Sequence, residues 1–197
     1  MPRVEVNGRV LDVDDTGGEG PPIVLSHPAY TDRTAFDAQV ETLDDVYRIL
    51  TWDPRDEDGA AGPDGTGWAA AQELFAVMDT LGVERAVLGG VADGCEVALR
   101  AALLHPDRVR ALIFMDPGLP RDGDEISDRL DELAMPVLVV HGADDAALPI
   151  ARAMALGEAV SDGRGVVAIS GARAGGNVTH PDPVNGALRS FLEGLPA

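Results

Sequence analysis

Apolar and polar residues along this chain follow two patterns. Short continuous apolar runs, which predict buried β-strands, are separated by longer segments with apolar residues three and four positions apart, which predict amphipathic helices. Near the start, residues 4–13 alternate apolar and polar side chains around Asn7-Gly8, which predicts a β-hairpin. The strands predicted after it span residues 22–26, 46–52, 85–88, 108–115, 136–141 and 165–170, and the helices span residues 34–43, 68–81, 96–104, 124–133, 150–160 and 183–192.

This alternation of apolar strands with helices is typical of an α/β fold. Strands that are apolar throughout are buried on both faces, so we predict a three-layer sandwich: a mostly parallel, twisted sheet with helices on both faces and an N-terminal antiparallel hairpin. No linker or repeat divides residues 1–197, so we predict a single domain. Sites in such sheets form at the carboxyl ends of the strands, which places the loops after Leu25, Leu88, Val140 and Ile169 along one edge.

The candidate chemistry centres on the turn Gly90-Val91-Ala92-Asp93-Gly94, which joins a predicted strand to a predicted helix. Glycine at both ends of such a turn lets the strand and helix backbones approach closely, so that the middle residue is displayed in a strained conformation. In the related turn Gly-x-Ser-x-Gly, the middle residue is a nucleophile. The middle residue here is Ala92, which has no nucleophilic atom.

Composition narrows the classes of function. The net charge of −19 argues against binding to nucleic acid or to an anionic membrane. The chain contains no lysine, which excludes Schiff-base chemistry, covalent attachment of pyridoxal phosphate and a P-loop lysine. One cysteine allows no internal disulfide, and no metal-ligand spacing occurs, so we expect no metal and no cofactor. Because no stretch resembles a membrane span or a signal peptide, we expect a cytoplasmic protein.

Five segments, in the same order along the chain, resemble motifs of the α/β-hydrolase family. The resemblance covers nearly the whole chain and implies the fold predicted above. The segments correspond to the family's oxyanion loop, its Asp-x-Arg loop, the approach to the nucleophile turn, the exit from the helix after that turn, and the acid strand. They are Ser26-His27-Pro28-Ala29, Trp52-Asp53-Pro54-Arg55, Leu81-Gly82-Val83-Glu84-Arg85, His105-Pro106-Asp107-Arg108-Val109-Arg110-Ala111-Leu112 and Val139-Val140-His141-Gly142-Ala143-Asp144-Asp145.

The resemblance also implies roles for individual positions. The nucleophile position falls on Ala92, the acid on Asp145 and the base on Ala174, in the family's chain order of Ser, Asp and His. The backbone N–H groups of Asp93 and Ala29 are the expected oxyanion hole. With alanine at two triad positions, hydrolysis of carboxylic esters is expected to be absent or very weak. The hole would still suit a small-molecule ester or acyl ligand.

We interpret the remaining candidate side chains as structural. Cys95 falls where the family buries a small residue, so we expect a buried apolar side chain rather than a nucleophile. His27 and His141 lie at predicted strand ends and are expected to make structural hydrogen bonds, while His180 is expected at a helix start or on the surface. Asp93 is expected to be exposed at the turn rather than to act as a desolvated general base.

The segment between Asp116 and Pro136 is short. Its nineteen residues have room for one helix, whereas many family members carry a helical lid there. We therefore expect no substantial lid and an open, shallow pocket. The sequence leaves the oligomeric state open, including the possibility that a neighbouring subunit covers the pocket.

Three accounts of the two alanines are open at this point. The chain is a serine hydrolase whose Ser and His have been replaced, by engineering or as a trapping variant. Alternatively, it is a natural non-catalytic member that binds a ligand or serves as a scaffold. In the third account it is a lyase or isomerase that uses the oxyanion hole without a nucleophile.

Overall fold

The computed structural model describes residues 3–6, 8–53, 67–118 and 126–196. Asn7 of the predicted hairpin turn, Pro54 and Arg55 of the second family motif, and residues 124–125 of a predicted helix lie outside the described residues.

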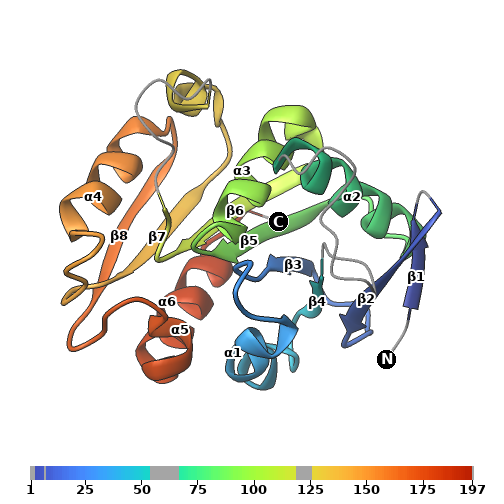
Figure 1. The fold of residues 1–197 in the computed structure, drawn as a ribbon, viewed down its shortest axis with the longest axis horizontal. Helices are drawn as coiled ribbons and strands as arrows, with labels where there is room; N and C mark the ends of the chain where they lie inside the picture. Colours follow the sequence, from blue (N-terminus) through green and yellow to red (C-terminus); the bar gives the residue numbers. More distant parts are fainter. Residues whose placement is uncertain (1–2, 7, 54–66, 119–125, 197) are drawn as a thin grey trace.

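Eight strands form the centre of the fold, and the spatial order of the sheet is β1-β2-β4-β3-β5-β6-β7-β8 (Figure 1). The hairpin β1–β2 is antiparallel, as is the β2–β4 pair, and every later pair is parallel. The predicted α/β sandwich with a mostly parallel sheet is therefore confirmed. The strands are β1 (Arg3–Val6), β2 (Arg9–Asp15), β3 (Pro22–Ser26), β4 (Arg48–Trp52), β5 (Ala86–Val91), β6 (Val109–Met115), β7 (Val137–Gly142) and β8 (Gly163–Ile169).

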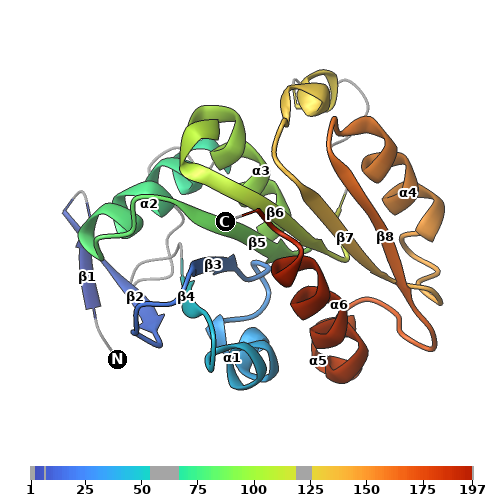
Figure 2. The ribbon, with the colours of Figure 1, turned by 180° about the vertical axis from the view of Figure 1, so that it is seen from behind.

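Helices cover both faces of this sheet. Helices α2, α3 and α4 lie on one face, and α1, α5 and α6 lie on the other, as the two opposite views show (Figures 1 and 2). Right-handed crossovers require this change of face, because the chain builds the sheet in one direction from β3 to β4 and in the other from β5 onward. The helices are α1 (Asp37–Leu43), α2 (Gly67–Thr80), α3 (Gly94–Leu104), α4 (Ile150–Ala159), α5 (Gly176–Thr179) and α6 (Pro181–Glu193).

Two buried clusters hold the layers together. Successive strand residues point to opposite faces of a sheet, and β3 illustrates the result. Val24 packs in the cluster that includes α2, α3 and α4, whereas Ile23 and Leu25 pack in the cluster that includes α1 and α6. This is why the strands read as continuous apolar runs in the sequence.

Three segments differ in detail from the sequence prediction. The predicted helix 34–43 begins as the 3₁₀ helix η1 (Arg33–Phe36), because the Asp32 carboxylate accepts the N–H of Thr34 and tightens the entry. Within the predicted helix 124–133, the described residues form only the 3₁₀ helix η3 (Ser127–Glu132). Between the strand predicted over residues 165–170 and the helix predicted over residues 183–192, the structure has one helical turn, α5, that was not predicted.

Within the described residues of the connection from β6 to β7, the helical segment is the 3₁₀ helix η3. Ile126, Leu130 and Leu133, at and beside η3, are buried in the core next to the sheet. Within the described residues, no helix has both the length and the apolarity needed to cross a membrane.

Candidate active site

The turn between β5 and α3 displays Ala92 in a conformation that is uncommon for any residue other than glycine. Its φ angle is +52°, in the left-handed region, which costs on the order of 1–2 kcal/mol for an L-residue. The Ala92 N–H donates a hydrogen bond to the carbonyl oxygen of Met115 at 3.0 Å, so the turn is anchored to the neighbouring strand β6. The strained middle residue predicted from the sequence is confirmed.

Gly90 and Gly94 are required by close backbone contacts. A Cβ atom on Gly90 would lie 2.3 Å from the carbonyl carbon of Gly94, and one on Gly94 would lie 2.0 Å from the carbonyl oxygen of Ser26. Both distances are far below van der Waals contact, and neither obstacle is a movable side chain. The steric explanation for the two glycines is therefore confirmed. The turn of residues 90–94, which we call the elbow, is packed against the end of β3.

Asp145, the predicted acid, lies in the loop after β7 and is 7% exposed. Its Oδ1 atom accepts the N–H groups of Ala147 at 2.8 Å and Leu148 at 3.0 Å. Its Oδ2 atom is also buried, but no hydrogen-bond donor among the described residues reaches it. Because a buried carboxylate oxygen without a partner is costly, this half of the carboxylate requires an explanation.

Ala174, the predicted base position, is exposed in the loop after β8. The acid loop and this loop are joined by their backbones, since the Asp144 N–H donates to the Ala172 carbonyl oxygen at 2.9 Å. Gly142 permits this approach, because a Cβ there would lie 2.4 Å from the carbonyl oxygen of Arg173. The loops after β5, β7 and β8 thus lie at one edge of the sheet. The catalytic roles of their residues stay predictions.

Asp116 is a buried carboxylate at this edge that the sequence analysis did not identify. It follows β6 with a φ angle of +46°, and its side chain is almost fully buried. Its Oδ1 atom accepts the Gly142 N–H at 2.8 Å, and its Oδ2 atom accepts those of Gly175 and Gly176 at 2.9 and 3.0 Å. His141 Nδ1 lies 3.4 Å from Oδ1. The signal in the sequence was a carboxylate immediately after a buried strand on the edge where sites form.

A buried amide network fixes the segment that follows Ala174. The Gln39 Nε2 group on α1 donates to the Asn177 carbonyl oxygen at 3.0 Å and to Asn185 Oδ1 at 2.8 Å. All three side chains are at least 95% buried. The network therefore ties α5 and α6 to α1, next to Gly175 and Gly176, which Asp116 binds.

The two predicted oxyanion-hole residues contact each other. The Ala29 N–H donates to the Asp93 carboxylate, at 3.1 Å from Oδ2 and 3.3 Å from Oδ1. Asp93 is exposed, as expected. Next to Ala29, burial and the negative charges of Asp93 and Asp116 raise the pKa of the Tyr30 phenol above its usual range. The loop after β3 and the elbow are thus in direct contact.

Cys95 is buried and structural. Its thiol donates to the carbonyl oxygen of Gly90 at 3.1 Å. Burial, the largest effect, raises the pKa of this thiol far above its usual range, so the nucleophilic thiolate is not available near neutral pH. This agrees with the expectation from the sequence.

The candidate histidines make short hydrogen bonds with nearby oxygen atoms. These are His27 Nδ1 with the Pro28 carbonyl oxygen at 2.9 Å, His141 Nε2 with the Leu148 carbonyl oxygen at 2.7 Å, and His180 Nδ1 with the Thr179 hydroxyl at 2.9 Å. His27 and His141 are buried, and their bonds fit the structural role predicted for them. The described residues gather no cluster of three or more His, Cys, Asp or Glu side chains that could hold a metal ion.

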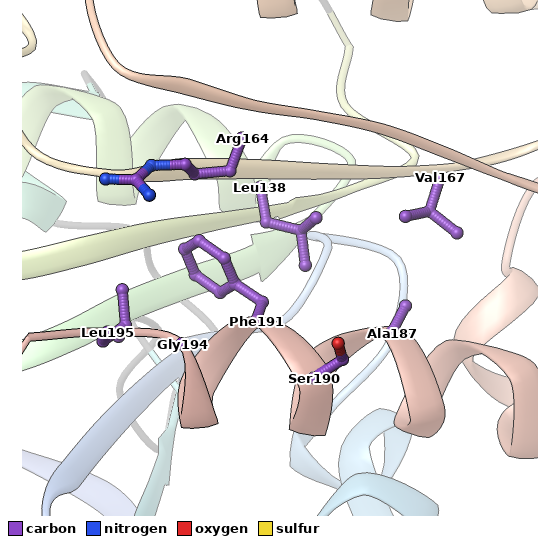
Figure 3. Close-up of a pocket in the computed structure, with 8 residues that line it drawn as sticks. All are labelled: Leu138, Arg164, Val167, Ala187, Ser190, Phe191, Gly194 and Leu195. Carbon is purple, nitrogen blue, oxygen red and sulfur yellow. The ribbon is translucent and has the colours of Figure 1, made fainter.

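Two of the cavities among the described residues lie away from the elbow. One, of about 320 Å³, is a groove between α6 and the strands β7 and β8, where Phe191 and Leu195 lie opposite Leu138 and Val167 (Figure 3). The other, of about 420 Å³, lies at the amino ends of the strands and is lined by Pro22, Val109 and Pro136 among others. Neither is lined by a residue of the predicted triad or oxyanion hole.

No protein-family model matches the chain. Epoxide hydrolase A of Mycobacterium tuberculosis is 32% identical over 125 residues, which are 60% of this chain and 39% of that protein, so the chain spans about two fifths of this relative. Putative carbamate hydrolase RutD of Agrobacterium fabrum is 25% identical over 264 aligned positions that cover 98% of both chains.

The RutD alignment is longer than the 197 residues of this chain, so the relative contains residues that have no counterpart here. Among solved structures, a thermophilic esterase from Thermogutta terrifontis superimposes with a TM-score of 0.86 and 24% identity, covering 98% of each chain. The sheet order and these likenesses together show that the chain has the α/β-hydrolase fold and is similar in sequence to enzymes with that fold.

Proposed function

We propose that the chain is an esterase-type α/β-hydrolase domain with alanine at the nucleophile position Ala92 and the base position Ala174. Such a domain binds a small ester or acyl ligand at the elbow and hydrolyses it very slowly or not at all. In a Ser-His-Asp triad the serine attacks, the imidazole accepts its proton, and the aspartate orients the imidazole. An aspartate alone performs neither the attack nor the proton transfer.

The half-bonded carboxylate of Asp145 is the observation that carries the proposal. Oδ1 is held by two backbone N–H groups, while Oδ2 is buried with no donor among the described residues. Asp116, which follows the neighbouring strand β6 at the same edge of the sheet, has both oxygen atoms bonded to backbone N–H groups. Asp116 is bonded as a structural aspartate is expected to be, whereas Asp145 has one oxygen that could accept an imidazole N–H and that no described residue reaches.

The elbow supports the same proposal. Ala92 keeps the strained φ angle of +52° although an alanine side chain gains nothing from it. The crowded glycines on either side hold the turn in this shape. Strain of this kind is typical of sites where a side chain must be displayed, and it supports position 92 as that of a nucleophile. The similar proteins are named for hydrolysis of different bonds, namely an epoxide hydrolase, a putative carbamate hydrolase and an esterase. They therefore support the hydrolase class but do not indicate which bond is cleaved.

Restoration of the two missing groups tests the proposal. The double variant Ala92→Ser/Ala174→His is assayed with short aryl esters beside the unchanged chain. We expect at least about a thousandfold more turnover, since loss of a serine or histidine from such a triad costs roughly a millionfold in kcat. A burst of product in the first turnover would indicate an acyl intermediate.

A third substitution tests the assignment of the acid. Asp145→Asn in the double variant should lower kcat by at least about a hundredfold, because the imidazole loses the group that orients it. The matched control is Asp162→Asn, which alters a partly exposed carboxylate in the turn before β8 that pairs with Arg164, and it should leave the turnover unchanged. A double variant that retains the native circular dichroism spectrum and has no turnover contradicts the proposal.

A further inference from the structure

We propose that Asp93 closes the oxyanion hole of this chain, with its carboxylate held by the Ala29 N–H where the oxyanion of a substrate would otherwise be held. The inference rests on the proposed function in one respect, namely that these two loops are taken as an oxyanion hole. A consequence is that the oxyanion hole selects against carboxylate ligands, because the carboxylate of Asp93 already occupies it.

The contact joins two loops that the fold brings together. Asp93 and Ala29 are 64 residues apart in sequence, but they follow the adjacent strands β5 and β3, which pair at Gly89 and Leu25. Both carboxylate oxygens lie within 3.3 Å of the same N–H. A hydrogen bond from a backbone N–H to an ionised carboxylate is about twice as strong as one between neutral groups, so the contact is a substantial competitor for any oxygen atom of a ligand.

Asp93 forms this contact in place of a more common local one. It lies at the N-cap of α3, where an aspartate side chain normally accepts an N–H from the first turn of its own helix. Here the Asp93 side chain makes no such bond. The carboxylate is turned away from α3 and toward the loop after β3, which indicates that the Ala29 N–H is the more favourable donor for it.

The surroundings of the contact are negatively charged. The charges of Asp93 and Asp116 both act on the Tyr30 phenol, which lies beside Ala29 and whose pKa they help to raise. A ligand carboxylate that approached Ala29 would meet the Asp93 carboxylate at the same N–H and would be repelled by it. A neutral carbonyl oxygen avoids this repulsion, but it must still displace Asp93 to reach Ala29.

Acetate is a direct probe, and the chain needs no catalytic activity for this test. Acetate is titrated into the ¹⁵N-labelled unchanged chain, the Asp93→Ala variant and the control Asp182→Ala. Asp182 is an exposed carboxylate in the first turn of α6, so the control removes the same charge from another helix start. We expect the Ala29 amide to respond to acetate with at least tenfold higher affinity in Asp93→Ala than in the other two proteins.

The proton shift of the Ala29 amide is a second readout that needs no ligand. Loss of the carboxylate acceptor should move it upfield in Asp93→Ala, and Asp182→Ala should leave it in place. Equal acetate affinity in all three proteins, or an Ala29 amide that does not respond to Asp93→Ala, overturns the inference.

Kinetics separate this inference from the proposed function. In the background Ala92→Ser/Ala174→His, addition of Asp93→Ala should raise kcat/KM for a short aryl ester at least tenfold. If both of these variants are folded and inactive while acetate binds as expected, the esterase proposal fails and the closed hole stands. If the double variant is active and Asp93→Ala changes neither kcat/KM nor acetate affinity, the closed hole fails and the esterase proposal stands.

Discussion

The substitution Gly94→Ala tests whether the elbow is packed as the structure describes. A helical Gly→Ala change by itself favours the folded state by about 1 kcal/mol. At Gly94 the added Cβ would lie 2.0 Å from the carbonyl oxygen of Ser26, whereas ordinary contacts begin at 3.4 Å. Overpacking of a rigid site costs roughly 1–3 kcal/mol and occasionally more, and backbone atoms on both sides leave little room for relaxation. We expect a net loss of about 2 kcal/mol in the free energy of unfolding.

Gly186→Ala is the matched control. Gly186 is also helical, in α6, but apart from its chain neighbours and the backbone of its own helix, no described atom lies within 4 Å of the position that its Cβ would take. It should raise the free energy of unfolding by roughly 0.5–1 kcal/mol. Urea unfolding followed by circular dichroism gives both values, and each 1 kcal/mol corresponds to about 2–4 °C in Tm for a domain of this size. If Gly94→Ala proves as stable as Gly186→Ala, the close approach of the elbow to β3 is wrong.

Three further predictions concern the buried groups of the edge. Asp116→Ala should lower the free energy of unfolding by about 3 kcal/mol or more, because three backbone N–H groups lose their acceptor; urea unfolding measures this, and a loss under about 1 kcal/mol would contradict it. Asp145→Asn should change stability by less than about 1 kcal/mol in the same assay, because the amide oxygen can keep the two Oδ1 bonds and the substitution replaces only an Oδ2 atom that no described donor reaches; a large loss would indicate that Oδ2 has a partner. Cys95 should resist a disulfide reagent at pH 8 in the folded chain and react on unfolding in urea, because its raised pKa keeps it in the thiol form below that pKa; rapid labelling of the folded chain would refute the buried placement.

Much of the fold could be predicted because burial on both faces leaves a simple pattern in the sequence. Strand β3 is apolar at successive positions, since Ile23 and Val24 pack on opposite faces. The details that were missed depend on local hydrogen bonds instead. The 3₁₀ turn η1 follows from the Asp32 side chain, and apolar spacing alone does not distinguish such a turn from the first turn of an α-helix.

The site was predictable to the extent that it depends on chain order. A turn with glycine at both ends and a carboxylate after a buried strand located Ala92 and Asp145. The roles of Asp116 and the contact between Asp93 and Ala29 were not predictable in the same way. They depend on which way side chains point between loops that are distant in sequence, and neither periodicity nor motif spacing carries that information.

Covalent labelling tests the central claim, namely that positions 92, 145 and 174 form the frame of a triad, most directly. The variant Ala92→Ser/Ala174→His is treated with an aryl fluorophosphonate, and the adduct is located by mass spectrometry. The account predicts one label per molecule at position 92, none on the unchanged chain, and labelling at least about a hundredfold slower when Asp145→Asn is added. A folded double variant that stays unlabelled, or one whose labelling does not depend on Asp145, would contradict it.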